Sequence, residues 1–143
     1  MLFFMKKNFV QLSLLFAIFV IATFLPNCQQ QSYTHGRIMY ENFCVSCHME
    51  DGSGLKGNIP PLAGADFLTE HADQLPCIIR YGINDTLVVN GITYTTPMAG
   101  IPQLKDVEIA NIINYINHAW GNDNGYTSVK VVQEQLQQCA SQK

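Results

Sequence analysis

Three residues have types and a spacing that could do chemistry together: Cys44, Cys47 and His48, in the run Cys-Val-Ser-Cys-His. Two thiols three positions apart lie on the same side of a helical turn, so both can bond to the vinyl groups of one haem. The imidazole of His48 follows directly and is placed to bind the haem iron from the proximal side. The run therefore predicts one haem c, attached covalently through Cys44 and Cys47.

Two other kinds of site use the same Cys-x-x-Cys spacing. A thioredoxin-like redox pair is expected in a βαβ setting, and a structural zinc site needs two more ligands, usually from a second close pair. Cys77 and Cys139 are far apart in the sequence and form no such pair. The haem interpretation is therefore favoured over both.

The N-terminus is typical of an exported protein. Lys6 and Lys7 precede a mostly apolar run from Phe9 to Leu25, which is the layout of a secretory signal. We expect residues 1–27 to be a signal peptide and the rest of the chain to leave the cytoplasm. An uncleaved membrane anchor is the alternative, because the run only just reaches the length that spans a bilayer.

The end of this segment resembles a lipoprotein processing site. Leu25-Pro26-Asn27-Cys28 is similar to the lipobox of bacterial lipoproteins, in which the cysteine becomes the lipid-modified first residue. The resemblance implies a lipid on Cys28, and residues 28–33 would then form a short tether. The domain that follows would be held on the periplasmic side of a bacterial membrane.

Charge argues against a nucleic-acid partner, and the remaining cysteines support a location outside the cytoplasm. The chain has 8 basic and 11 acidic side chains, so nucleic acid is not an expected partner. Cys77 and Cys139 remain after haem and lipid are assigned, and disulfides persist outside the cytoplasm. A disulfide between them would stabilise the domain by about 4 kcal/mol on the chain-entropy model. Two free thiols are the alternative.

The apolar pattern predicts a mainly α domain over residues 34–143, with a C-terminal extension from about residue 122. Helices are expected over residues 34–43, 104–120 and 128–138. Gly36 lies inside the first helix, where Gly costs about 1 kcal/mol relative to Ala. We therefore expect another backbone to pass close to Gly36.

The middle of the chain is expected to hold short elements. Two helical pieces are predicted between Asp66 and Gly82, with Asp73 as a cap, Pro76 in a first turn, and Ile78, Ile79 and Tyr81 buried. Asn90-Gly91 lies between two strand-like segments, residues 86–89 and 92–95, and this dipeptide is a strong signal for a tight turn. A small β-hairpin is predicted there.

Several of these motifs, in this order, resemble the class I cytochromes c. Gly36 and Tyr40 precede Cys44 by eight and four residues, as in the N-terminal helix of that family, and the hairpin resembles one found in a bacterial monohaem subgroup. The resemblance implies a cytochrome c fold in which the N- and C-terminal helices cross around a covalently bound haem. It also implies that the Pro61 carbonyl accepts a hydrogen bond from His48, that Leu62 packs on the haem, and that the hairpin residue Tyr94 borders it.

The distal iron ligand expected from this resemblance is Met98, in the loop between the hairpin and the last major helix. Met39 lies on the N-terminal helix, and Met49 follows His48 too closely to reach the opposite haem face. A role for Met98 as core packing is one alternative. Ligation by His71 or His118 is another, because haems with two histidine ligands exist.

The function implied is one-electron transfer between redox protein partners, without enzyme activity. Iron held by His48 and Met98 has no open position, so no substrate site and no catalytic residue are expected. One alternative is a haem subunit through which electrons enter a larger oxidase or dehydrogenase. A haem gas sensor or haem enzyme is the other, and it would require an open distal position.

Overall fold

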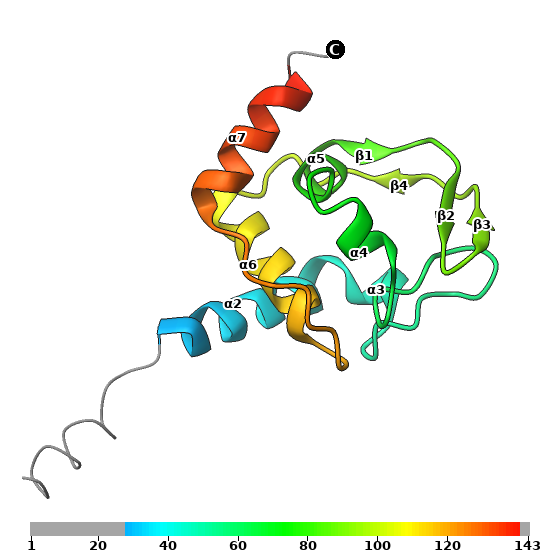
Figure 1. The fold of residues 1–143 in the computed structure, drawn as a ribbon, viewed down its shortest axis with the longest axis horizontal. Helices are drawn as coiled ribbons and strands as arrows, with labels where there is room; N and C mark the ends of the chain where they lie inside the picture. Colours follow the sequence, from blue (N-terminus) through cyan, green and yellow to red (C-terminus); the bar gives the residue numbers. More distant parts are fainter. Residues whose placement is uncertain (1–27, 141–143) are drawn as a thin grey trace, which may run out of the picture.

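The computed structural model describes residues 28–140, so the predicted signal peptide, residues 1–27, lies outside the described residues. The described part is mainly helical, with four very short strands (Figure 1). The elements in chain order are α2 (Cys28–Phe43), α3 (Val45–His48), α4 (Phe67–Glu70), α5 (Leu75–Tyr81), β1 (Gly82–Ile83), β2 (Leu87–Val89), β3 (Ile92–Tyr94), β4 (Met98–Ala99), α6 (Asp106–His118) and α7 (Val129–Ala140). Within residues 28–140, no helix combines the length and apolar character needed to span a bilayer.

The crossing of α2 and α6 forms the centre of the fold, as predicted (Figure 1). Gly36 lies against the backbone carbonyl of Asn111, and a Cβ on Gly36 would also meet the Cβ of Tyr115 at 2.8 Å. One turn further along α2, Tyr40 is buried, with its ring centroid 5.3 Å from that of Tyr115. The expectation that another backbone passes close to Gly36 is therefore confirmed.

Helix α2 begins at Cys28 rather than at residue 34, so the segment expected to be a tether is helical. A contact with the core accounts for the last residue of that segment, Tyr33. Its ring is partly buried against the core, with its centroid 5.2 Å from that of Tyr115. This contact makes it favourable for the first helix to extend beyond the crossing.

The predicted hairpin is present as β2 and β3, with Leu87 opposite Tyr94 and Val89 opposite Ile92. Both turn residues have positive φ, 51° at Asn90 and 73° at Gly91, which is the conformation that this turn requires. A second antiparallel pair was not predicted. It joins β1 to β4, with Ile83 opposite Met98, and two-residue strands carry no periodicity that a sequence could reveal.

Two details of the middle segment were predicted wrongly. Asp73 does not cap α5, because the residue at the cap is Gln74, which makes no side-chain capping bond. Tyr81 is 41% exposed rather than buried. Leu75 and Ile79, four positions apart, form the buried face of α5, and Tyr81 is displaced from that face by two positions.

Helices α6 and α7 complete the core. The buried face of α6 carries the predicted isoleucines, namely Ile109, Ile112, Ile113 and Ile116. Its first turn is closed by the Glu108 carboxylate, which accepts a hydrogen bond of 2.6 Å from the Lys105 backbone N–H. Helix α7 packs on α5 and α6 through Val132 and Leu136, as predicted for a terminal helix.

A disulfide links α7 to α5. It joins Cys77 to Cys139, whose Cα atoms are 6.2 Å apart and which are separated by 62 residues in the sequence. The pairing is the one predicted, and the alternative of two free thiols does not hold in this structure.

The contact at Gly36 leads to a first prediction. Gly36→Ala should lower the free energy of unfolding by about 1–3 kcal/mol, because the added methyl group would force α2 away from the Asn111 carbonyl. Chemical denaturation of the haem-loaded protein measures this. His35→Ala, at an exposed position on the same helix, is the control and should change stability by no more than about 0.5 kcal/mol. A Gly36→Ala protein as stable as wild type would contradict the crossing.

Candidate functional site

A cavity in the described domain has a volume of about 450 Å³ and is lined almost entirely by apolar side chains. Its walls come from α2, α3, α4, α5, α6, both strand pairs and the loop after His48. This size lies within the usual range for ligand sites, which is roughly 300–1,000 Å³. Every element that borders the cavity therefore presents its apolar face to one shared space.

Cys44 and Cys47 line one wall of this cavity. The backbone N–H groups of Cys47 and His48 both donate to the Cys44 carbonyl, at 3.1 and 2.9 Å, so the run forms one tight helical turn. Both cysteines are free thiols, Cys44 partly buried and Cys47 exposed. Burial, with a smaller effect of the neighbouring Cys47, raises the pKa of the Cys44 thiol to about 12. The predicted attachment residues are therefore brought together at the cavity.

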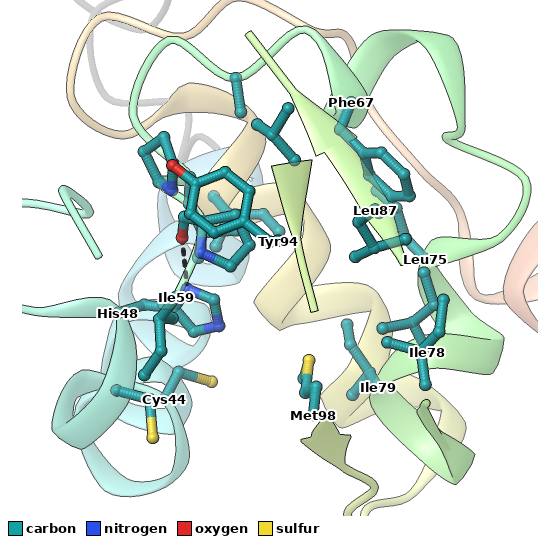
Figure 2. Close-up of a pocket in the computed structure, with 18 of the residues that line it drawn as sticks. Cys44, His48, Ile59, Phe67, Leu75, Ile78, Ile79, Leu87, Tyr94 and Met98 are labelled. Carbon is teal, nitrogen blue, oxygen red and sulfur yellow. Dashed lines mark hydrogen bonds between the residues drawn. The ribbon is translucent and has the colours of Figure 1, made fainter. Parts of the chain in front are cut away.

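His48 is buried beside them, and its orientation is set by a backbone carbonyl. Its Nδ1 lies 3.2 Å from the carbonyl oxygen of Pro60. Because a carbonyl can only accept, Nδ1 carries the proton and Nε2 keeps its lone pair. Figure 2 shows the His48 ring at the edge of the cavity, with this bond on the side away from Met98.

The partner of His48 was predicted to be Pro61, and that prediction is wrong by one residue. The carbonyl that reaches Nδ1 belongs to Pro60. The loop returns tightly at Gly54, whose backbone N–H donates to the His48 carbonyl at 3.1 Å, and a Cβ on Gly54 would lie 2.5 Å from the Ile59 oxygen. This close return brings the Pro60 carbonyl to His48, and both Pro60 and Pro61 line the cavity.

Burial lowers the pKa of the His48 imidazole, and the bond to Pro60 opposes this effect only in part. The neutral form is the one that can bind a metal through Nε2. Its environment therefore favours the state that a metal ligand requires.

Aromatic side chains hold the loop after His48 against the helical core. The Tyr40 hydroxyl donates to the Met49 carbonyl at 2.6 Å, and the Trp120 indole N–H donates to the Glu50 carbonyl at 2.9 Å. Gly52 faces the Trp120 ring so closely that a Cβ would lie 2.6 Å from it. Trp120 also packs edge-on against Tyr40. The loop that carries Pro60 is thus fixed to the crossing of α2 and α6.

Two asparagines also position this loop, and sequence reasoning gave them no such role. The Asn122 side chain accepts from the Gly64 N–H at 2.7 Å and donates to the carbonyls of Leu62 and Ile116. The Asn90 side chain accepts from the Asp66 N–H at 3.0 Å and donates to the Gly64 carbonyl. Asn90 lies in the hairpin turn, and the Asn-Gly pattern indicated only the turn and not the hydrogen bonds of the Asn90 side chain to the loop. Asn122 lies at the predicted start of the C-terminal extension, where no signal separated it from an ordinary turn residue.

Met98 lines the cavity from β4, and Figure 2 shows it across the space from His48. Leu62 and Tyr94 also line the cavity, as the resemblance implied. The two rival ligands, His71 and His118, do not line the cavity. The His71 Nδ1 lies 3.2 Å from the Gln74 amide nitrogen, and the His118 Nδ1 lies 2.9 Å from the Asn114 carbonyl, both outside the cavity.

The donor set and the cavity fit a haem c. Two thiols on one turn can form two thioether bonds, an imidazole with a free lone pair adjoins them, and the remaining walls are apolar enough to enclose a porphyrin. Among the described residues, no group of three or more His, Cys, Asp or Glu side chains could hold a metal ion without such a ligand frame. The site therefore fits iron held in a porphyrin rather than a bare metal ion.

Residues 33–120 match the family model for cytochrome c. The chain belongs to the cytochrome c family. Its cofactor is therefore covalently bound haem c, and its fold is that of a class I monohaem cytochrome.

Relatives with known names agree with this assignment. The chain is 39% identical over 83 residues to cytochrome c-552 of Thermus thermophilus, covering 55% of this chain and 63% of that protein. It is 31% identical over 90 residues to the cytochrome c subunit of a quinone-dependent alcohol dehydrogenase from Gluconobacter oxydans, covering 62% of this chain and 19% of the subunit. A fructose dehydrogenase cytochrome subunit from Gluconobacter japonicus is also 31% identical, over 71% of this chain and 22% of its own length. The match thus spans less than two thirds of each of these relatives.

Cys44 and Cys47 are free thiols at the cavity, whereas Cys77 and Cys139 form a disulfide, and this difference leads to a second prediction. Wild-type protein should keep its haem after denaturation and gain the mass of one haem, because two thioether bonds hold it. The double variant Cys44→Ser/Cys47→Ser should lose covalent haem completely. Mass spectrometry and haem staining after denaturing electrophoresis measure both outcomes.

The matched control is Cys77→Ser/Cys139→Ser, which removes the disulfide cysteines and should keep covalent haem. Covalent haem in the Cys44→Ser/Cys47→Ser protein, or its loss from the control, would mean that the attachment residues are assigned wrongly.

Proposed function

We propose that this cytochrome c is a one-electron carrier whose haem iron is bound by His48 on one side and Met98 on the other. The observation that carries the proposal is the placement of an imidazole and a thioether across one apolar cavity, with both free thiols at its wall. Haem c supplies an iron that changes its oxidation state by one electron. The role of the chain is to hold that iron and to control what reaches it.

His48 and its surroundings supply the proximal ligand. The bond from Nδ1 to the Pro60 carbonyl fixes both the tautomer and the ring orientation, which is the usual role of a partner to a ligating histidine. Burial keeps the imidazole neutral by lowering its pKa. These two effects together would keep Nε2 available to the iron across the neutral pH range.

Met98 supplies the distal ligand. A thioether is a soft donor, and ligation by Met and His favours the reduced iron and raises the reduction potential. His48 and Met98 would hold the iron between them, so a small molecule could bind to it only by displacing Met98. Electron transfer without substrate binding is the function that this ligand pair supports.

A haem subunit that passes electrons within a dehydrogenase is the second candidate. It is favoured by one observation, the similarity to cytochrome subunits of alcohol and fructose dehydrogenases. The same iron site serves a free carrier and a bound subunit, and in both cases the partners are redox proteins. Copurification of a dehydrogenase with the native protein would identify the second candidate.

Export and attachment to a membrane are part of the proposal. The charged and apolar pattern of residues 1–27 supports a signal peptide, and Cys28 at the start of α2 would carry the lipid. A lipid at this point would place the cytochrome at the periplasmic surface of a bacterial membrane. Globomycin, which blocks the peptidase that processes lipoproteins, should cause accumulation of the uncleaved precursor.

The test of the iron site is exposure of the reduced, haem-loaded protein to carbon monoxide while its visible spectrum is recorded. The wild-type spectrum should not change, because Met98 occupies the distal position. Met98→Ala should bind carbon monoxide rapidly and completely.

Met39→Leu is the control, because it replaces a partly buried methionine outside the cavity with a residue of similar volume. It should behave as wild type. Rapid binding of carbon monoxide by the wild-type protein would exclude Met98 ligation and favour a sensor or an enzyme.

A further inference from the structure

Two glycines, Gly82 and Gly100, bring the backbone around Met98 into direct contact with the backbone at the end of α5. A Cβ on Gly82 would collide with the Met98 carbonyl oxygen and lie 2.6 Å from the Gly100 nitrogen. A Cβ on Gly100 would collide with the backbone carbon of Tyr81 and lie 2.5 Å from the Gly82 nitrogen. Neither position can therefore accept a side chain unless the strand that carries Met98 moves.

Backbone hydrogen bonds hold the Met98 segment against α5 on both sides of this contact. On one side, β4 pairs with β1, which places Ile83 opposite Met98. On the other side, the Ile101 N–H donates to the Ile79 carbonyl at 2.9 Å, and Ile79 belongs to α5. The position of Met98 is thus set by α5 and the two residues that follow it.

Helix α5 is in turn fixed to the C-terminal part of the chain. Cys77, in its middle, is bonded to Cys139 of α7. Helix α7 is seated on the core by Val132, which is fully buried, and by Leu136. The disulfide therefore connects the segment that positions Met98 to a helix on the outside of the domain.

We propose that Gly82, Gly100 and the Cys77–Cys139 disulfide are positioning residues that hold the Met98 thioether in place on the distal side of the cavity. The proposal rests on the proposed function, because it assumes that Met98 is the distal ligand. Met98 is then a ligand whose retention depends on a frame formed by α5, β1, β4 and α7.

The physical reason is that the position of the Met98 side chain depends on the position of the backbone of β4, which is a short strand. The strand β4 has two residues and pairs only with β1, so it has little structure of its own. A ligand that must lie within a fraction of an ångström of its bonding position needs a supporting shell. The glycine contact and the disulfide supply that shell.

The first experiment compares glycine variants by the affinity of the ferric protein for cyanide, which binds when Met98 leaves. Gly82→Ala and Gly100→Ala should each raise this affinity about tenfold or more, because the added methyl group displaces the strand. Gly91→Ala is the matched control. Gly91 and Gly82 both have positive φ, 73° and 80°, but nothing lies within 4 Å of a Cβ on Gly91. The control should keep the wild-type affinity even though its turn is strained.

The second experiment tests the disulfide without touching the strand. Cys77→Ser/Cys139→Ser should raise the cyanide affinity about threefold or more, which is the lower range of coupling between elements in contact. Tyr33→Ala is the control, because it removes a contact between α2 and Tyr115 of α6, outside the cavity and outside α5 and α7, and lowers global stability while the disulfide stays intact. It should leave the cyanide affinity unchanged, so that a general loss of stability is separated from the loss of positioning.

The outcomes separate this inference from the proposed function. If wild-type protein already binds carbon monoxide rapidly, Met98 is not a firm ligand and both fail. If wild-type protein excludes carbon monoxide but either set of variants binds cyanide no better than its control, the positioning role is overturned and the electron carrier remains. Higher affinity in both sets, with both controls unchanged, supports the positioning role.

Discussion

The close approach of the α2 and α6 backbones at Gly36 is the constraint on which the other parts of the structure depend. It is a contact between main chains, so side-chain bulk is excluded and the angle between the helices is fixed. The C-terminal end of α2 then delivers Cys44, and the end of α6 delivers Trp120 and Asn122. One contact thus places the attachment turn and the residues that hold the proximal loop. The haem site is the space that remains beside this crossing.

The two sides of the cavity are supported differently. His48 lies on a helical turn and is oriented by a loop that Tyr40, Trp120 and Asn122 fix to the helical core. Met98 lies on a two-residue strand that depends on α5 for its position. The proximal side is therefore part of the main core, whereas the distal side is held by a smaller, separate set of contacts.

The sequence predicted those features that are encoded by local pattern. The Cys-x-x-Cys-His run, the Asn90-Gly91 turn and the apolar faces of α6 and α7 each depend on neighbouring residues, and all are found in the structure. Gly36 was predicted for the right reason, because an unfavourable residue inside a helix needs a compensating contact. In each of these cases the physical cause lies within a few positions along the chain.

Features set by distant contacts were missed or placed wrongly. The carbonyl partner of His48 was shifted by one residue, because the path of a glycine-rich loop depends on Trp120, far along the chain. The pairing of β1 with β4 and the roles of Asn90 and Asn122 arise only when the chain has folded. Tyr81 was expected to be buried, but the register of α5 turns it outward. A single sequence does not encode these relations locally.

The disulfide has a consequence for how this chain would mature under the export proposed above. With Cys28 set aside for the lipid, the other four thiols can pair in three ways. The two in Cys-Val-Ser-Cys are neighbours, whereas Cys77 and Cys139 are separated by 62 residues. In an oxidising compartment the neighbouring pair closes more readily, since a short loop costs less entropy than a long one. Closure of that pair would consume the sulfurs that haem attachment needs. Under the proposed export, haem attachment would therefore have to come before oxidation of the Cys44–Cys47 pair, or follow its reduction, while the distant pair is left to oxidise.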